Sequence, residues 1–98
     1  MFKELDPVLH SQLRLAIVSI LLSVEEAEFV YLKQQTQATS GNLSLQLEKL
    51  RAAGYIVIEK GYKNKYPVTT CKISAAGINA FEMYTNAIKE YLNLTDKS

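Results

Sequence analysis

The stretch EFVYLKQQTQATSGNLSLQLEKLRAAGYIVIEKGYKNKYPVTTCKIS, residues 28–74, decides the fold of this chain. In its opening segment, Glu28–Thr36, the apolar residues Phe29 and Leu32 stand three positions apart, which indicates a short helix with both side chains facing inward. A tight turn at Gln37-Ala38 is expected to end this helix.

A second helix is predicted over residues 39–53. Thr39 is a favourable N-cap, and Leu43, Leu47 and Leu50 follow at the i, i+4 and i+7 spacing of a single helix face. Gly54 is well placed to end the helix as a C-cap. Two helices joined by a tight turn form a helix-turn-helix.

Residues 55–73 predict a β-hairpin, because two runs rich in β-branched and aromatic residues surround a polar loop that contains Gly61. Strict alternation puts Ile56 and Ile58 on the face that packs against the helices. Cys71, on the second run, alternates onto the same face. We therefore interpret Cys71 as a buried apolar residue rather than a reactive thiol.

A helix over residues 7–24 is expected to precede this stretch, because Asp6-Pro7 joins an N-cap to the residue favoured at the first helical position. One apolar stripe recurs at spacings of three and four: Leu9, Leu13, Ala16, Ile17, Ile20, Leu21 and Val24. A second strip lies on another side: Leu15, Val18 and Leu22. A helix that is apolar on two sides needs more cover than one face of a small domain usually gives. Residues 25–27 are expected to be a short connection.

A last helix is predicted over residues 75–93, capped by Ser74. Its apolar residues form a short heptad-like seam: Phe81, Tyr84, Ile88 and Tyr91. This seam and the surplus strip of the first helix are expected to meet each other or a second subunit. Residues 94–98 are expected to form a frayed tail.

With 98 residues, of which 48% are hydrophobic, the chain is expected to be one domain spanning residues 1–98. The predicted class is α+β, mostly α, with a three-helix core, a two-stranded hairpin and a C-terminal helix. The longest apolar run, Leu15–Val24, is far shorter than the roughly 20 residues of a membrane span. Because the N-terminus also lacks the pattern of a signal peptide, a cytoplasmic protein is expected.

The single cysteine, Cys71, excludes an internal disulfide. The single histidine, His10, has no second His or Cys at local ligand spacing, so no metal and no cofactor are expected. The chain has no Ser-His-Asp set, no clustered carboxylates in apolar surroundings and no phosphate-binding loop, which argues against an enzyme.

Charge is distributed unevenly along the chain. The window from Lys49 to Lys72 holds six basic residues and one acid, a local charge of +5 in a chain of net charge +1, so the rest carries −4. Such asymmetry suggests a basic face for a polyanion, although a solvated basic surface explains it equally well.

In order along the chain, four motifs resemble the core of the MarR/ArsR-like winged helix-turn-helix regulators, in particular their minimal single-domain group. The motifs are Gly41-Asn42-Leu43-Ser44, Ala53-Gly54-Tyr55, Pro67 to Thr70, and Ser74 to Gly77. His10 and the run Arg14–Ile17 in the first helix resemble the group as well. The resemblance spans about Leu9 to Tyr84 and implies a winged helix, usually a homodimer, that binds operator DNA. Members of the group also sense ligands, metals or oxidation, so the resemblance leaves open whether this protein binds a small-molecule effector.

In this interpretation the helix over residues 39–53 is the recognition helix. The residues expected to contact DNA from it are Thr39, Ser40, Gly41, Asn42, Ser44, Leu45, Gln46 and Lys49. Leu45 is either a contact to a thymine methyl group or an ordinary exposed leucine. Glu48 on this side either repels phosphate, unless it accepts from a cytosine, or pairs locally near Lys49, Arg51 and Ala52 and stays clear of DNA.

The hairpin is the expected wing, and its candidate DNA contacts are Lys60, Lys63, Asn64, Lys65 and Tyr66. Phosphate contact is favoured over the alternative, in which the lysines keep an exposed hairpin soluble and block edge pairing.

The candidate dimer interface consists of Leu15, Val18, Leu22, Phe81, Tyr84, Ile88 and Tyr91. Tyr84 and Tyr91 are favoured as core or interface aromatics over walls of an effector pocket. His10 and Arg14, one helical turn apart, are favoured as a structural pair over a sensing site.

The resulting hypothesis is a homodimeric regulator that binds a near-palindromic site in double-stranded DNA and has no membrane partner. The alternative is a winged-helix module that binds protein rather than DNA.

Overall fold

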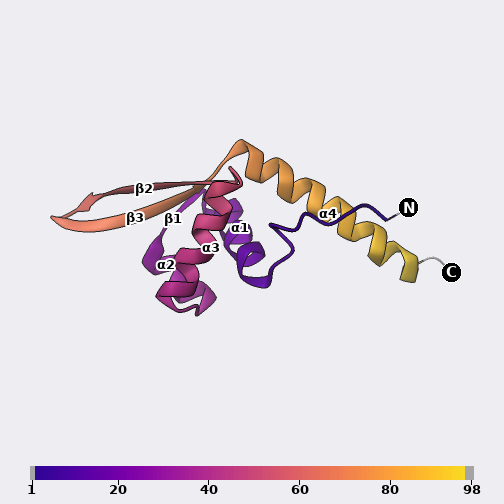
Figure 1. Cartoon of the computed structure of the whole chain (residues 1–98), viewed down its shortest axis with the longest axis horizontal. Coiled ribbons are helices and arrows are strands. Elements are labelled where there is room, and N and C mark those ends of the chain that lie inside the picture. Colours follow the sequence, from indigo (N-terminus) through magenta and orange to yellow (C-terminus); the bar gives the residue numbers. More distant parts are fainter. Residues whose placement is uncertain (1, 97–98) are drawn as a thin grey trace.

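The computed structural model describes residues 2–96 and confirms the predicted class, an α+β fold that is mostly helical. Its elements are α1 (Gln12–Val24), β1 (Glu26–Glu28), α2 (Phe29–Thr36), α3 (Ser40–Ala52), β2 (Ile56–Lys63), β3 (Tyr66–Ile73) and α4 (Ala75–Asp96). The helices α1, α2 and α3 gather at the centre, while β2 and β3 extend as a ribbon to one side and α4 extends to the opposite side (Figure 1). No helix within residues 2–96 is long and apolar enough to cross a membrane.

The sheet has three strands rather than the two expected, in the order β1-β3-β2, and both pairings are antiparallel. The expectation that residues 25–27 are only a connection is wrong, because Glu26–Glu28 forms β1 and pairs with β3, Ala27 opposite Cys71. Ala27 is buried, whereas Glu26 is exposed on the outer face of the sheet. A strand this short has no pattern of its own and exists because β3 supplies its hydrogen-bond partners.

Helix α1 begins at Gln12 rather than at Pro7, so the predicted start is wrong. Asp6 does cap a turn, since its carboxylate accepts from the Val8 N–H at 2.9 Å, but this turn is separate from the helix. The N-cap of α1 is Ser11, whose hydroxyl accepts from the Arg14 N–H at 3.4 Å. The break lets Leu9 turn into the core, where it is fully buried.

The helix-turn-helix forms as the sequence predicts. Gln37 adopts a left-handed conformation, φ 57°, which ends α2. The Thr39 hydroxyl then accepts from the Asn42 N–H at 3.2 Å and caps α3. At the other end, Gly54 has φ 82°, a conformation that glycine adopts without strain and that turns the chain into β2.

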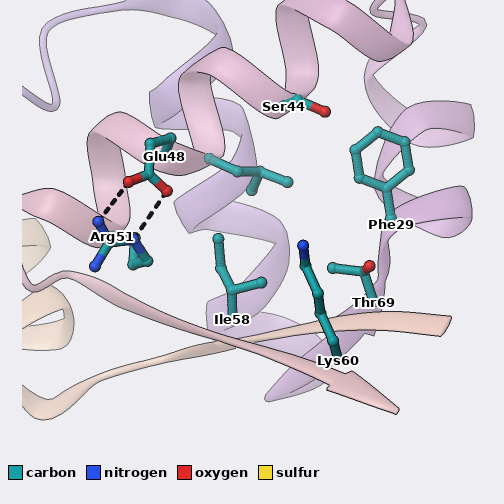
Figure 2. Close-up of a pocket in the computed structure, with 8 residues that line it drawn as sticks. Phe29, Ser44, Glu48, Arg51, Ile58, Lys60 and Thr69 are labelled. Atoms are coloured by element: carbon teal, nitrogen blue, oxygen red, sulfur yellow. Dashed lines mark hydrogen bonds and ion pairs between the residues drawn. The ribbon is translucent and has the colours of Figure 1, made fainter. Parts of the chain in front are cut away.

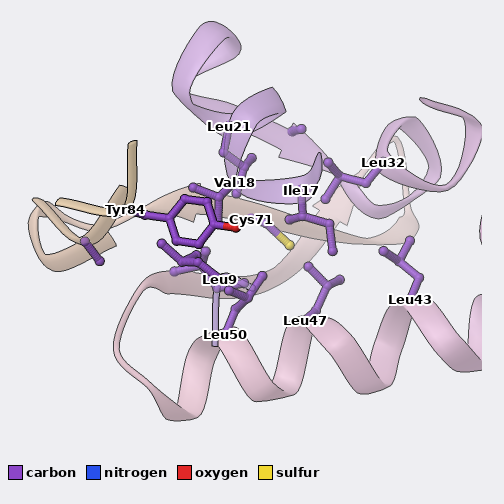
Figure 3. Close-up of a cluster of buried hydrophobic side chains, with 13 residues drawn as sticks. Leu9, Ile17, Val18, Leu21, Leu32, Leu43, Leu47, Leu50, Cys71 and Tyr84 are labelled. Atoms are coloured by element: carbon purple, nitrogen blue, oxygen red, sulfur yellow. The ribbon is translucent and has the colours of Figure 1, made fainter. Parts of the chain in front are cut away.

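The core lies between the three central helices and the inner face of the sheet (Figure 3). Leu43, Leu47 and Leu50 all point into it from α3, which confirms the predicted inward face. Cys71 is fully buried, and burial raises the pKa of its thiol to about 11. At neutral pH the group is therefore a neutral thiol, as the alternation of β3 predicts.

The start of α4 is held against the beginning of β2. The Ser74 hydroxyl accepts from the Gly77 N–H at 3.0 Å and donates to the Gly54 carbonyl at 2.6 Å. A Cβ atom on Gly77 would stand 2.2 Å from the carbonyl oxygen of Tyr55, so only glycine allows this approach. The helix continues to Asp96, beyond the predicted end at residue 93; the part of the expected frayed tail at residues 97 and 98 lies outside the described residues.

Candidate nucleic-acid interface

The solvent-facing side of α3 carries the candidate contact residues. Those that are exposed are Thr39, Ser40, Gly41, Asn42, Ser44, Leu45 and Lys49. Leu45 leaves 53% of its surface in solvent, consistent with both interpretations of an outward leucine. Gln46 differs from the others, because it is half-buried at the edge of this face.

Glu48 is paired along its own helix rather than left unpaired on the outer face. Its carboxylate accepts from the guanidinium of Arg51 through two hydrogen bonds, one of which measures 2.8 Å from Nε to Oε2. This hydrogen bonding lowers the pKa of Glu48, with smaller contributions from the charges of Arg51 and Lys60. Of the two alternatives for Glu48, the structure shows the local pairing.

A cleft of about 750 Å³ separates α3 from the wing (Figure 2). Phe29, Leu47 and Ile58 form its apolar lining, and the polar lining consists of Ser44, Glu48, Arg51, Lys60 and Thr69. Lys60 extends from β2 toward α3, and Thr69 stands opposite it in the strand register. The cleft therefore joins the exposed face of α3 to the inner face of the wing.

The wing lysines lie on different faces of the hairpin. Because side chains alternate along a strand, Lys60 shares the inner face with Ile56 and Ile58, whereas Lys63 lies on the outer face. Asn64 and Lys65 form the two-residue tip, both with positive φ, 52° and 69°, as in the tight turns favoured in hairpins.

Two exposed tyrosines flank this tip. Tyr62 is 80% exposed and Tyr66 is 74% exposed. In the strand register Tyr62 stands opposite Pro67, on the face of Lys60, and Tyr66 stands opposite Lys63 on the other face. Tyr62 was not among the residues predicted to contact DNA. The strand register shows that it lies on the opposite face of the hairpin from Tyr66.

The outer face of the sheet is largely neutralised. Lys63 Nζ lies 3.4 Å from a carboxylate oxygen of Glu28, and Lys72 Nζ lies 3.2 Å from Glu59 and 3.6 Å from Glu26. Two of these carboxylates, those of Glu26 and Glu28, belong to β1. The excess positive charge of residues 49–72 is thus partly offset by acids that lie far away in the sequence.

Three lysines of the basic window have no carboxylate within ion-pair distance in the described part of the chain: Lys49 on α3, Lys60 in the cleft and Lys65 at the wing tip. All three are exposed. We call these three residues the open lysines.

Arg14 of α1 reaches across to α3. Its Nε donates to the Val8 carbonyl at 2.6 Å, and its Nη1 donates to the side-chain oxygen of Gln46. The Gln46 amide in turn donates to the side-chain oxygen of Asn42 at 3.0 Å. The sequence does not predict the contact between Arg14 and Gln46, because a contact over 32 residues leaves no local pattern.

Whereas Arg14 contacts α3 and the N-terminal segment, His10 contacts α4. Its Nδ1 lies 2.9 Å from the hydroxyl of Tyr84, which ties the N-terminal segment to α4. Nearby, the Tyr55 hydroxyl donates to the Asp6 carboxylate at 2.5 Å. This hydrogen bond, followed by burial, raises the pKa of Tyr55 to about 12.

The candidate dimer residues fall into three groups. Val18 and Tyr84 belong to the core of the chain itself, so they have little or no surface to offer a partner. Four others are half-buried: Leu15, Leu22, Phe81 and Ile88. Leu15, Phe81 and Ile88 line an apolar groove of about 400 Å³ between α1 and α4. Tyr91 is exposed, and its ring lies 4.7 Å from that of Phe2.

A helix-turn-helix with an exposed second helix, followed by a β-ribbon beside it, defines a winged helix-turn-helix protein. The family model of the winged helix DNA-binding domain matches residues 13–92, and the chain belongs to this family. The winged-helix resemblance seen in the sequence motifs is thereby confirmed.

Among relatives, the uncharacterized protein MJ0432 of Methanocaldococcus jannaschii is 34% identical over 88 residues, which cover 90% of this chain and 92% of that protein. The fold is also similar to the structure of a transcriptional regulator homologue from Pyrococcus horikoshii OT3, with a TM-score of 0.84, 24% identity and coverage of 91% of this chain and 88% of that one. NadR, solved in complex with 4-hydroxyphenylacetate, matches with a TM-score of 0.70, 21% identity and coverage of 93% and 67%. At these identities the two solved structures show a shared fold.

Proposed function

We propose that the protein is a cytoplasmic transcriptional regulator that binds specific sites in double-stranded DNA as a homodimer, without catalytic activity. The observation that carries this proposal is the exposed face of α3 beside a cleft that Lys60 of the wing also lines, with the further open lysines Lys49 on α3 and Lys65 at the wing tip. In a family described as a DNA-binding domain, such a surface fits a recognition helix flanked by a phosphate-binding wing.

The dimensions support this arrangement. With 13 residues, α3 is about 20 Å long, and a single helix fits the major groove, which is about 12 Å wide. Lys49 then lies beside the bases, while Lys60 and Lys65 face the backbone. Each open lysine that contacts a phosphate adds salt-sensitive affinity without sequence preference.

The homodimer is supported by the shape of the chain. Its Cα radius of gyration is 15.2 Å, whereas a compact domain of this size has about 13 Å. The excess arises because α4 extends past the core on one side and the wing on the other (Figure 1). We propose that the groove of Leu15, Phe81 and Ile88 packs against its counterpart in a second copy, which would place two recognition helices on a near-palindromic site.

A small-molecule effector is a further part of the proposal. NadR was solved with a phenolic acid bound, and the present chain has a hollow of about 680 Å³ between its N-terminal segment and α4. Asp6, Tyr55 and Asn79 supply polar groups to this hollow, and Ala80 and Met83 supply apolar surface. A raised melting temperature in the presence of an aromatic acid would support binding.

The test is fluorescence anisotropy with duplex DNA from the region upstream of the protein's own coding sequence, at several salt concentrations. We expect the logarithm of the association constant to fall linearly with the logarithm of the salt concentration. We also expect the upstream duplex to be bound more tightly than unrelated duplexes. Binding that is absent at low salt would contradict the proposal. It would favour the second candidate, a protein-binding winged helix, for which the neutralised outer face of the wing is the supporting observation.

A further inference from the structure

The Arg14, Gln46 and Asn42 side chains form a hydrogen-bond chain that runs from half-buried Arg14 on α1 to the exposed face of α3. The Arg14 guanidinium is anchored by the carbonyls of Val8, at 2.6 Å, and Pro7, at 3.4 Å. It donates to Gln46 Oε1, and Gln46 Nε2 donates to Asn42 Oδ1 at 3.0 Å. Asn42 is exposed and lies in the first turn of α3.

The direction of this chain is set at its inner end. A guanidinium has only donors, so Gln46 must turn its oxygen toward Arg14 and its NH2 group toward Asn42. Asn42 must then turn its own oxygen toward Gln46. Its NH2 group is left facing outward. A side-chain amide can both donate and accept, but here the Asn42 amide presents only its donors to the exterior.

We infer that Arg14, acting through Gln46, fixes Asn42 as a hydrogen-bond donor toward DNA. The inference rests on the proposed function, in which this face of α3 meets DNA. An asparagine with both groups available pairs bidentately with adenine. With its oxygen turned toward Gln46 and its NH2 group turned outward, Asn42 instead selects acceptors, which are the phosphate oxygens or the acceptor atoms of guanine, thymine O4 and adenine N7. Arg14 is a positioning residue, since it lies behind α3.

The decisive variant is Gln46→Glu. A carboxylate still accepts from Arg14 but cannot donate to Asn42, so Asn42 turns its NH2 group inward and its oxygen outward. Binding is measured against the best duplex selected by the wild-type protein and against duplexes with each single base pair replaced. If Asn42 reads a base, the preference at one position shifts from an acceptor to a donor such as cytosine N4. If Asn42 contacts phosphate, affinity falls by about fivefold or more at all sites alike.

The added negative charge of Gln46→Glu is controlled by repeating it in the Asn42→Ala background. The added charge alone changes binding equally in both backgrounds. The hydrogen-bond relay from Arg14 through Gln46 to Asn42 contributes only when Asn42 is present. Gln46→Met is a second variant without added charge, and it frees Asn42 to rotate, so preference should relax toward adenine. Far-UV circular dichroism and melting curves verify that each variant is folded.

Equal effects of Gln46→Glu in the two backgrounds, with the wild-type protein binding DNA normally, would overturn the relay and leave the proposed function standing. Absence of salt-dependent binding by the wild-type protein would overturn both.

Discussion

At the scale of single residues, the neighbours of each lysine decide how much of its charge is available to DNA. Lys60 and Lys63 are three positions apart and both exposed, yet Lys63 is paired with Glu28 and Lys60 has no carboxylate within ion-pair distance in the described residues. A lysine that is already paired releases fewer counterions when it meets a phosphate. The two residues are therefore a natural matched pair.

Lys60→Ala is expected to weaken DNA binding uniformly across sequences and to reduce the slope of log affinity against log salt by about 1. Lys63→Ala, which removes the same formal charge, should leave the slope nearly unchanged. Anisotropy titrations over a range of salt concentrations measure both. Equal slopes for the two variants would contradict the assignment of Lys60 to the interface.

Tyr55 gives a residue-scale prediction for alkaline pH. Its pKa is raised from an ordinary 10.0 to about 12 in the folded chain, first by the hydrogen bond to Asp6 and then by burial. A raised folded pKa means that the stabilisation is fully present below pH 10 and is lost as the pH rises toward 12.

We expect Tyr55→Phe to lower the free energy of unfolding by about 1 kcal/mol at pH 7, the usual contribution of one hydrogen bond. The difference from the wild-type protein should be constant up to about pH 10 and shrink above it. Urea unfolding at a series of pH values measures this difference. A gap that widens with rising pH would show that the Tyr55–Asp6 hydrogen bond is not its source.

At the scale of elements, the junction between β2 and α4 sets the direction of the long helix. Ser74 caps α4 and also donates to the carbonyl of Gly54, in the turn between α3 and β2, and Gly77 allows the backbone of Tyr55 to come close. The Ser-x-x-Gly motif is thus explained by two needs, a cap and a close approach of backbone.

Gly77→Ala should destabilise the fold by about 1–3 kcal/mol, because the added methyl group meets backbone that must shift. The matched control is Gly41→Ala, also in a helix but with nothing within 4 Å of the new Cβ atom. That change should be neutral or stabilise by up to about 1 kcal/mol. Thermal and urea unfolding measure both variants, and an equally stable Gly77→Ala would contradict the tight junction.

At the scale of the whole molecule, α4 and the wing extend from opposite sides of a small core, and the chain measures 59 × 25 × 21 Å. Such an elongated chain leaves the apolar groove between α1 and α4 open to solvent in the monomer. Two recognition helices acting together need a rigid connection between copies, and α4 is the element long enough to supply it.

Ile88→Lys is expected to convert a dimer into a monomer of 11.0 kDa, because it places a charge in the apolar groove. Ile78→Lys is the control, since Ile78 lies on the same helix, is 45% exposed and does not line that groove. Light scattering after size-exclusion chromatography gives the mass, and anisotropy should show weaker DNA binding for Ile88→Lys alone. A wild-type protein that is monomeric at micromolar concentration would contradict the homodimer.

The sequence by itself determined the features that depend on neighbours along the chain. The leucine spacing of α3, the cap at Thr39, the turn at Gly54 and the alternation that buries Cys71 are local patterns, and local hydrogen bonds and side-chain periodicity produce them directly. They were sufficient to predict the winged-helix architecture and the recognition helix.

Tertiary structure alone decided which candidate residues are available for function. β1 exists only through its pairing with β3, and it brings Glu28 to Lys63, 35 positions away. Arg14 likewise finds Gln46 only once α1 packs against α3. Charge pairing and hydrogen-bond direction depend on distances in space that no local pattern encodes, so the open lysines and the orientation of Asn42 emerge only in the folded chain.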